Sequence, residues 1–116
     1  MLITITDRDD LLDGALQELA ERRLRFALSR FDNRVSRLEL VVGDENGPRG
    51  GVDKSCRLTV RLKRARDVVI TDKDESMAAC ISRVAERAAR SVARAIDRQQ
   101  DFDRVRPSFV SPARSN

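Results

Sequence analysis

Apolar residues alternate with polar residues, or gather in short β-branched runs, in four segments of the chain. Both patterns are typical of strands that bury one face. The segments that we predict as strands are Leu2–Thr6, Val35–Val42, Ser55–Lys63 and Asp67–Thr71. The alternation is cleanest in Ser55–Lys63, and the last two segments are predicted to pair as a hairpin.

Two longer segments repeat apolar residues at intervals of three or four positions, which is the period of an amphipathic helix. The first helix is predicted over Leu12–Phe31, with the side chain of Asp10 as its N-terminal cap. Asp72 and Glu75 form a D-x-x-E start signal for a second helix that runs to about Gln99. We therefore expect two helices and four strands.

Two other segments lack a sustained period. Gly43–Asp53 holds four glycines and a proline, which predicts a mobile loop between two strands. Residues 101–116 hold two prolines and three serines, and ordering them would bury little apolar area. We therefore predict one domain over residues 1–100 and a flexible tail over residues 101–116.

The order of these elements, β-α-β-β-β-α, restricts the fold. A right-handed crossover through the first helix makes the first two strands parallel, and the later strands add as antiparallel neighbours. Each strand has only one strongly apolar face, so both helices should cover the same side of the sheet. The sequence thus predicts a two-layer α+β domain with a four-stranded mixed sheet.

The composition excludes several classes of function. The chain has no histidine, which removes His-based catalysis and His-ligated zinc or haem. Cys56 and Cys80 form no C-x-x-C pair and have apolar neighbours, so we expect buried thiols. We therefore predict no enzyme, no cofactor, no metal site and no small-molecule substrate.

The chain shows no sign of a membrane or secretory location. No apolar run approaches the roughly 18 residues that a membrane span needs. The first residues lack the basic start and hydrophobic block of a signal peptide. We expect a cytoplasmic protein without membrane contacts.

Positive charge is the most informative feature of the sequence. The chain has 23 Lys and Arg residues against 19 Asp and Glu residues, which favours a polyanionic partner. Five arginines of the second predicted helix share a sector of roughly 80°, turned away from the apolar side of the helix. This arginine stripe consists of Arg83, Arg87, Arg90, Arg94 and Arg98. In the helix sequence only Glu86 and Asp97 flank it.

Charged helix faces often serve solubility alone. Taken by itself, the stripe fits this interpretation about as well as it fits a binding face. The stripe is nearly single-signed, however, and a row of guanidiniums can contact several phosphates of one nucleic-acid strand. The first helix adds further basic candidates, namely Arg22, Arg23 and Arg25. Three basic residues of a predicted strand are weaker candidates for binding, because charges on strands commonly prevent aggregation. They are Arg57, Arg61 and Lys63.

Aromatic residues are scarce, which bears on the kind of nucleic acid. The chain has no Tyr or Trp, and its four phenylalanines are predicted to lie mostly in the core or the tail. We therefore expect no aromatic platform for stacking single-stranded bases. Folded RNA, recognised by its shape and phosphates, fits the sequence better.

Three segments resemble the family of ribosome hibernation promoting factors and ribosome-associated inhibitors, also called sigma-factor modulation proteins. They are the opening LITIT, the helix ALQELAERRLRFALSRFDNRV and the segment CISRVAERAARSVAR. The last looks like the family pattern A-I-D-x-x-x-D-K-L-x-R-Q-L-x-K. The resemblance covers about residues 1–100 and implies a fold similar to double-stranded-RNA-binding domains. It places basic family positions at Arg23, Arg87, Arg90 and Arg94.

By this resemblance, the protein would be a stress-response translation inhibitor that binds rRNA of the small ribosomal subunit and occludes the mRNA and tRNA sites. A monomer is the expected state. The alternative is a regulatory module of the same fold whose basic face binds an acidic protein. The predicted RNA-binding residues are Arg22, Arg23, Arg25, Arg83, Arg87, Arg90, Arg94 and Arg98.

Overall fold

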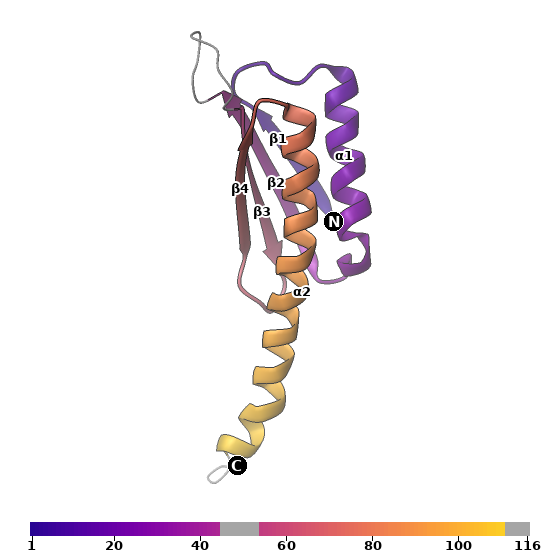
Figure 1. Ribbon diagram of the computed structural model, residues 1–116. Helices are drawn as coiled ribbons and strands as arrows, with labels where there is room; N and C mark the ends of the chain where they lie inside the picture. The colour runs from indigo at the N-terminus through magenta and orange to yellow at the C-terminus, as the bar shows by residue number, and fades with distance from the viewer. Residues whose placement is uncertain (45–53, 111–116) are drawn as a thin grey trace.

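The computed structural model describes residues 1–44 and 54–110, with side chains described up to Asp101. Its elements follow the predicted order, with one short 3-10 helix after the first helix (Figure 1). They are β1 (Leu2–Asp7), α1 (Gly14–Leu28), η1 (Ser29–Phe31), β2 (Val35–Asp44), β3 (Lys54–Leu62), β4 (Val68–Asp74) and α2 (Met77–Val110).

The strands form one sheet in the order β1-β2-β3-β4. β1 pairs with β2 in parallel, and the other two pairs are antiparallel, as predicted. The register aligns Ile5 with Leu40, Leu40 with Leu58, and Leu58 with Ile70. Because alternate residues of a strand share a face, this row places one apolar side of all four strands together.

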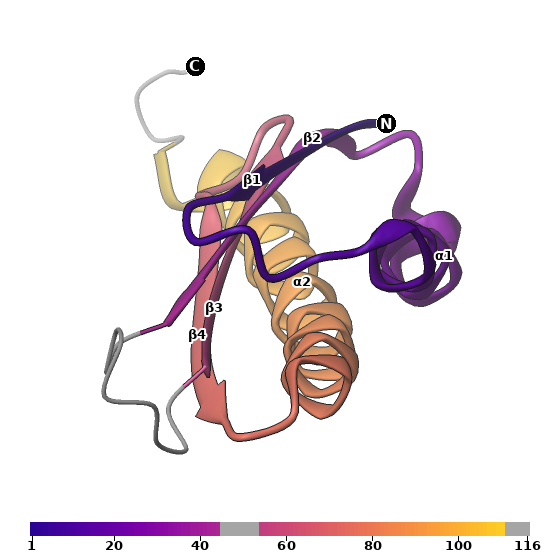
Figure 2. The same cartoon turned by 90° about the horizontal axis from the view of Figure 1, so that it is seen from above.

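Both helices cover that apolar side, and Figure 2 shows them on the same side of the sheet. Leu24 and Leu28 of α1 and Ile81 and Val84 of α2 are fully buried against it. Neither described helix covers the opposite side of the sheet, which exposes residues such as Val69. The predicted two-layer α+β fold is confirmed. Side chains of α1 and α2 can contribute to one site only in the helix layer.

The N-terminus of α1 lies later than predicted. Asp13, not Asp10, caps the helix, because its Oδ1 accepts a hydrogen bond of 2.8 Å from the backbone N–H of Leu16. Asp10 has a φ of 56° and lies in the preceding turn. The carboxylate of Asp7 holds that turn by accepting the N–H groups of Leu11 and Leu12, each at 2.8 Å. The turn between β1 and α1 is thus longer than the spacing of apolar residues in the sequence indicates.

The start of α2 also differs from the prediction. Asp72 belongs to β4, so the D-x-x-E signal at Asp72 and Glu75 does not open the helix. Ser76 takes that role: its Oγ accepts the N–H of Ala79 at 3.2 Å, and Asp74 in turn accepts the N–H of Ser76 at 2.8 Å. Asp72 is therefore available to pair with groups on α2.

The helix α2 continues to Val110, so the prediction that it ends near Gln99 is wrong. A helix that is already formed adds residues at little cost, and residues 100–106 contain neither glycine nor proline. In Figure 1 the end of α2 extends beyond the sheet. The predicted mobile loop falls mostly on residues 45–53, and the end of the predicted tail on residues 111–116, both outside the described residues.

Candidate nucleic-acid interface

The basic residues of α1 lie on its outer side. Ala20, Leu24 and Leu28 are buried in the core and define the inner side of this helix. Arg22, Arg23 and Arg25 are exposed, and none of them forms an ion pair with a carboxylate of the described residues. Their charges therefore face solvent.

The second half of the arginine stripe is also exposed. Arg90, Arg94 and Arg98 lie on the outer side of α2, whose inner side buries Ala88, Val92 and other apolar residues. Arg94 donates a hydrogen bond of 3.2 Å to the Oγ of Ser91. Within residues 1–44 and 54–101, no carboxylate forms an ion pair with these three arginines.

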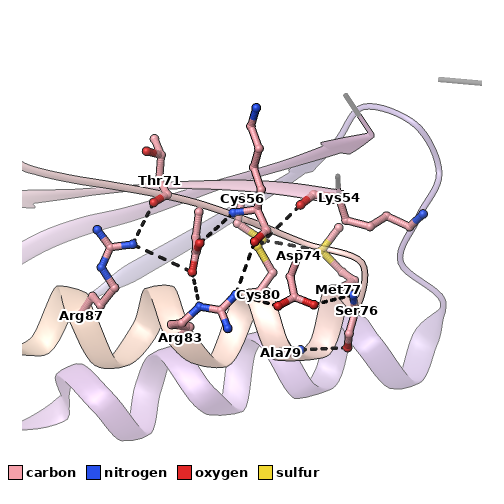
Figure 3. Close-up of polar contacts among 12 residues, drawn as sticks. Lys54, Cys56, Thr71, Asp74, Ser76, Met77, Ala79, Cys80, Arg83 and Arg87 are labelled. Atoms are coloured by element: carbon pink, nitrogen blue, oxygen red, sulfur yellow. Dashed lines mark hydrogen bonds and ion pairs between the residues drawn. The ribbon is translucent and has the colours of Figure 1, made fainter. Parts of the chain in front are cut away.

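The first half of the stripe is different, because β4 supplies partners that the helix sequence does not contain. Arg83 donates through Nε to Asp72 and through Nη2 to Asp74, the latter at 2.8 Å. Arg87 donates to the carbonyl oxygen of Thr71 at 2.9 Å and lies 3.9 Å from Asp72 (Figure 3). The helix sequence, in which only Glu86 and Asp97 flank the stripe, therefore does not show the partners of its first two arginines.

These contacts follow from strand alternation. Ile70, Asp72 and Asp74 are alternate residues of β4 and face the helix layer, with Ile70 buried and the two aspartates half-buried at the end of the strand. Because α2 begins directly after β4, its second turn passes beside these carboxylates. We call the group of Arg83, Asp72 and Asp74 the β4 clamp.

The β4 clamp shifts the ionisation of its members. Burial opposes ionisation of Asp72, but hydrogen bonds from Arg83 and from the N–H of Lys73 outweigh it and lower the pKa of that carboxyl. The hydrogen bond from Arg83 lowers the pKa of Asp74 as well. The two aspartates, Asp74 foremost, raise the pKa of the Arg83 guanidinium. The clamp is therefore fully charged at neutral pH.

A groove lies between α1 and α2 on the outer side of the helix layer. It has a volume of about 460 Å³, and both helices contribute an arginine to it, Arg23 from α1 and Arg90 from α2. Its full lining is Arg23, Phe26, Ala27, Ser82, Ala85, Glu86, Ala89 and Arg90. Small side chains on both helices leave this space open between the arginines.

Sequence analysis missed Phe26, which is 83% exposed and lines the groove. It also lines a neighbouring hollow of about 310 Å³ with Leu19, Arg22 and Arg23. The expectation that the phenylalanines offer no exposed aromatic platform is therefore wrong. A helical projection of α1 contains the signal, because Leu24 and Leu28 define the buried side and Phe26 lies two positions from each.

The uncovered side of the sheet carries charges that largely pair with each other. Arg61 donates to Glu39 at 3.1 Å and to Asp67 at 2.9 Å, and Arg37 also contacts Glu39. The hydrogen bond from Arg61 lowers the pKa of Glu39. Arg57 and Lys63 are exposed. Positive and negative charges are therefore interleaved on this side of the sheet.

The two cysteines are buried in the core, as predicted. Cys56 on β3 donates through Sγ to the Sδ of Met77 at 3.6 Å, close to Cys80 on α2 (Figure 3). The contact with Cys80 and burial raise the pKa of the Cys56 thiol.

In the described part of the chain, no group of three or more His, Cys, Asp and Glu side chains is arranged so that it could hold a metal ion. Nor does that part contain a helix that is long and apolar enough to span a membrane.

Solved structures share this fold. A ribosomal subunit interface protein from Coxiella burnetii matches with a TM-score of 0.67 and 15% identity, over 81% of this chain and 96% of that one. The N-terminal domain of Protein Y from Thermus thermophilus matches with a TM-score of 0.66 and 19% identity, over 81% of this chain and 98% of that one. At such identities the likeness establishes the fold alone.

Family membership rests on the sequence. A search of curated proteins finds no match. The family model described as sigma 54 modulation protein and S30EA ribosomal protein, in contrast, matches residues 3–100. This range contains α1, most of α2 and all four strands apart from the first residue of β1, and it agrees with the resemblance found in the sequence. The chain belongs to the sigma 54 modulation protein and S30EA ribosomal protein family.

Proposed function

We propose that this protein binds rRNA of the small ribosomal subunit through arginines of α1 and α2 and inhibits translation by occupying the mRNA and tRNA sites. Family membership supports a ribosomal role. The observation that carries the RNA contact is a set of exposed arginines on two adjacent helices, without carboxylate partners among the described residues. We call this set the arginine face: Arg22, Arg23, Arg25, Arg90, Arg94 and Arg98.

The arginine face suits a phosphate surface for physical reasons. Guanidinium groups are weakly hydrated and bind phosphate oxygens through two parallel hydrogen bonds. Arg23 and Arg90 line the same groove from different helices, so the face spans both helices and is not a single row. A rigid, two-helix layer of cations can contact phosphates on more than one strand of a folded RNA.

Arg83 and Arg87 have a different part in this proposal. Their guanidiniums hold α2 against β4 through Asp72, Asp74 and the carbonyl of Thr71. Each remains partly exposed, with 42% of its side chain accessible. We assign them to positioning α2, with direct phosphate contact coming mainly from the arginine face.

Co-sedimentation with purified small subunits tests the proposal. The variant Arg90→Glu/Arg94→Glu/Arg98→Glu should remain in the upper fractions of the gradient, where the wild-type chain moves with the subunit. The matched control is Arg57→Glu/Lys63→Glu/Lys73→Glu, which makes the same charge change at exposed positions outside the helix layer. The control should still co-sediment.

Two results would contradict the proposal. Equal loss in both triple variants would assign binding to net charge alone. Failure of the wild-type chain to co-sediment would favour the alternative that the basic face binds an acidic protein. Inhibition is tested separately in a purified translation system, where the wild-type chain should lower peptide synthesis and the helix variant should not.

A further inference from the structure

Phe26 has no role in the core. It lies on the outer side of α1 with 83% of its surface exposed, although burying a phenylalanine is normally favourable. The other large apolar residues that are exposed within residues 1–44 and 54–101, Leu2 and Val69, belong to the sheet. Phe26 alone among these three lies between cations and lines two adjoining hollows.

The surroundings of Phe26 combine an aromatic face, cations and a few neutral contacts. Arg23 and Arg90 line the groove of about 460 Å³ beside it, and Arg22 lines the neighbouring hollow. Ser82 and Glu86 supply a hydroxyl and a carboxylate on the α2 side. The remaining lining residues are alanines, namely Ala27, Ala85 and Ala89, which leave room for a flat group against the ring.

We infer that this groove binds one unstacked nucleotide of the RNA, with its base on the ring of Phe26 and its flanking phosphates on Arg23 and Arg90. The inference rests on the proposed RNA contact and adds its chemistry. Bases that leave a helix stack on aromatic side chains, and this stacking adds substantially to affinity. Ser82 and Glu86 can hydrogen-bond to the edge of the base, since a carboxylate accepts from exocyclic amino groups.

The charges favour a nucleotide over two other occupants. A second copy of this chain would bring like arginines against each other, because a two-fold contact pairs each surface with itself. An acidic peptide would satisfy Arg23 and Arg90 but would place its carboxylates beside Glu86. A nucleotide separates the two functions, because its phosphates carry the charge and its base is neutral.

Substitutions at Phe26 test this inference on small ribosomal subunits. Phe26→Ala should weaken binding by about tenfold, in line with the loss of one base stack. Phe26→Leu should be weakened similarly, because leucine keeps an apolar side chain but lacks a π face, and Phe26→Trp should bind at least as well as the wild type. Val69→Ala is the matched control, since Val69 is exposed outside the helix layer, and it should not change binding.

The chain has no Tyr or Trp, so Phe26→Trp introduces its one strong fluorophore. Its emission should be quenched by an RNA hairpin with one bulged adenosine more than by the fully paired hairpin. Val69→Trp should show no such difference.

The outcomes separate this inference from the proposed function. If the wild-type chain does not bind small subunits, the proposed function fails, and the inference fails with it. If the wild type binds and Phe26→Ala binds equally well, the inference alone is overturned. Wild-type affinity in Phe26→Leu, or equal quenching by both hairpins, would also overturn it, because either result means an apolar contact without base stacking.

Discussion

At the scale of single residues, ion pairing decides which arginines are available to a ligand. Arg83 is held by two carboxylates of β4, whereas Arg90 faces the groove between the helices. Both belong to the same stripe on α2, and their sequence neighbours do not distinguish them. The difference comes from the neighbouring strand β4, so the stripe divides into a part that contacts β4 and a part without carboxylate partners among the described residues.

The β4 clamp makes a pH-dependent contribution to stability. Asp72 and Asp74 have lowered pKa values in the folded chain, so their stabilisation is present above their unfolded value of about 4 and is lost as pH falls through the folded values. Arg83→Gln should therefore lower the urea midpoint of unfolding at pH 7, and the difference from wild type should shrink below pH 4. Arg94→Gln, which removes no carboxylate contact, should match the wild type throughout. A difference for Arg83→Gln that is independent of pH would contradict the clamp.

The residue scale also shows what the sequence could and could not provide. Helical spacing identified the arginines of both helices, because a period is a local property. The partners Asp72 and Asp74 could not be found in this way, because their side of β4 and its distance from α2 depend on the sheet register. Phe26 could have been found, since it falls outside the buried period of α1.

At the scale of elements, type and order were predictable, but the helix ends were not. Strand alternation and helical period depend on many residues, and they correctly gave the mixed sheet covered by helices on one side. A helix end depends on a single cap, and several acidic residues compete for that role before each helix. Asp13 and Ser76 are the N-terminal caps, because the preceding turns place their side chains next to the first free backbone N–H groups of the helices.

The caps can be tested by substitution. Asp13→Ala and Ser76→Ala should each lower the free energy of unfolding by about 1 kcal/mol, measured by urea titration. Asp10→Gly should not lower it, because glycine adopts a positive φ without strain. If Asp10→Gly proved as destabilising as Asp13→Ala, the cap would have to be assigned to Asp10.

The two sides of the sheet should differ in their tolerance of truncation. Leu58 is fully buried under the helices, and Leu58→Ala should cost about 2–5 kcal/mol of unfolding free energy. Val69, on the neighbouring strand, faces away from the helices, and Val69→Ala should change stability by about 0.5 kcal/mol or less. Similar losses at both positions would mean that a second layer covers the sheet.

At the scale of the whole molecule, Arg61 and Glu39 pair on the sheet side and the β4 clamp pairs at the start of α2, whereas the arginine face forms no ion pair with a carboxylate of the described residues. Under the proposed function, this asymmetry should turn the helix layer toward the RNA. It also means that affinity should depend on how many phosphates the arginine face neutralises, a quantity that salt dependence measures directly.

Binding to small subunits should weaken steeply with salt. With about five phosphates neutralised, the logarithm of the affinity should fall against the logarithm of salt concentration with a slope of roughly −4. Arg90→Gln should reduce the steepness by about one, while Arg83→Gln should leave it nearly unchanged. Equal slopes for the two variants would return Arg83 to the contact surface.

The contribution of α2 to the core has a consequence for synthesis. Ile81, Val84 and Val92 are fully buried, so the sheet has no complete core until α2 has been made. A nascent chain that still holds these residues in the exit tunnel lacks both the packed domain and half of the arginine face, namely Arg90, Arg94 and Arg98. Under the proposed function, the growing polypeptide should therefore not bind the ribosome that is translating it.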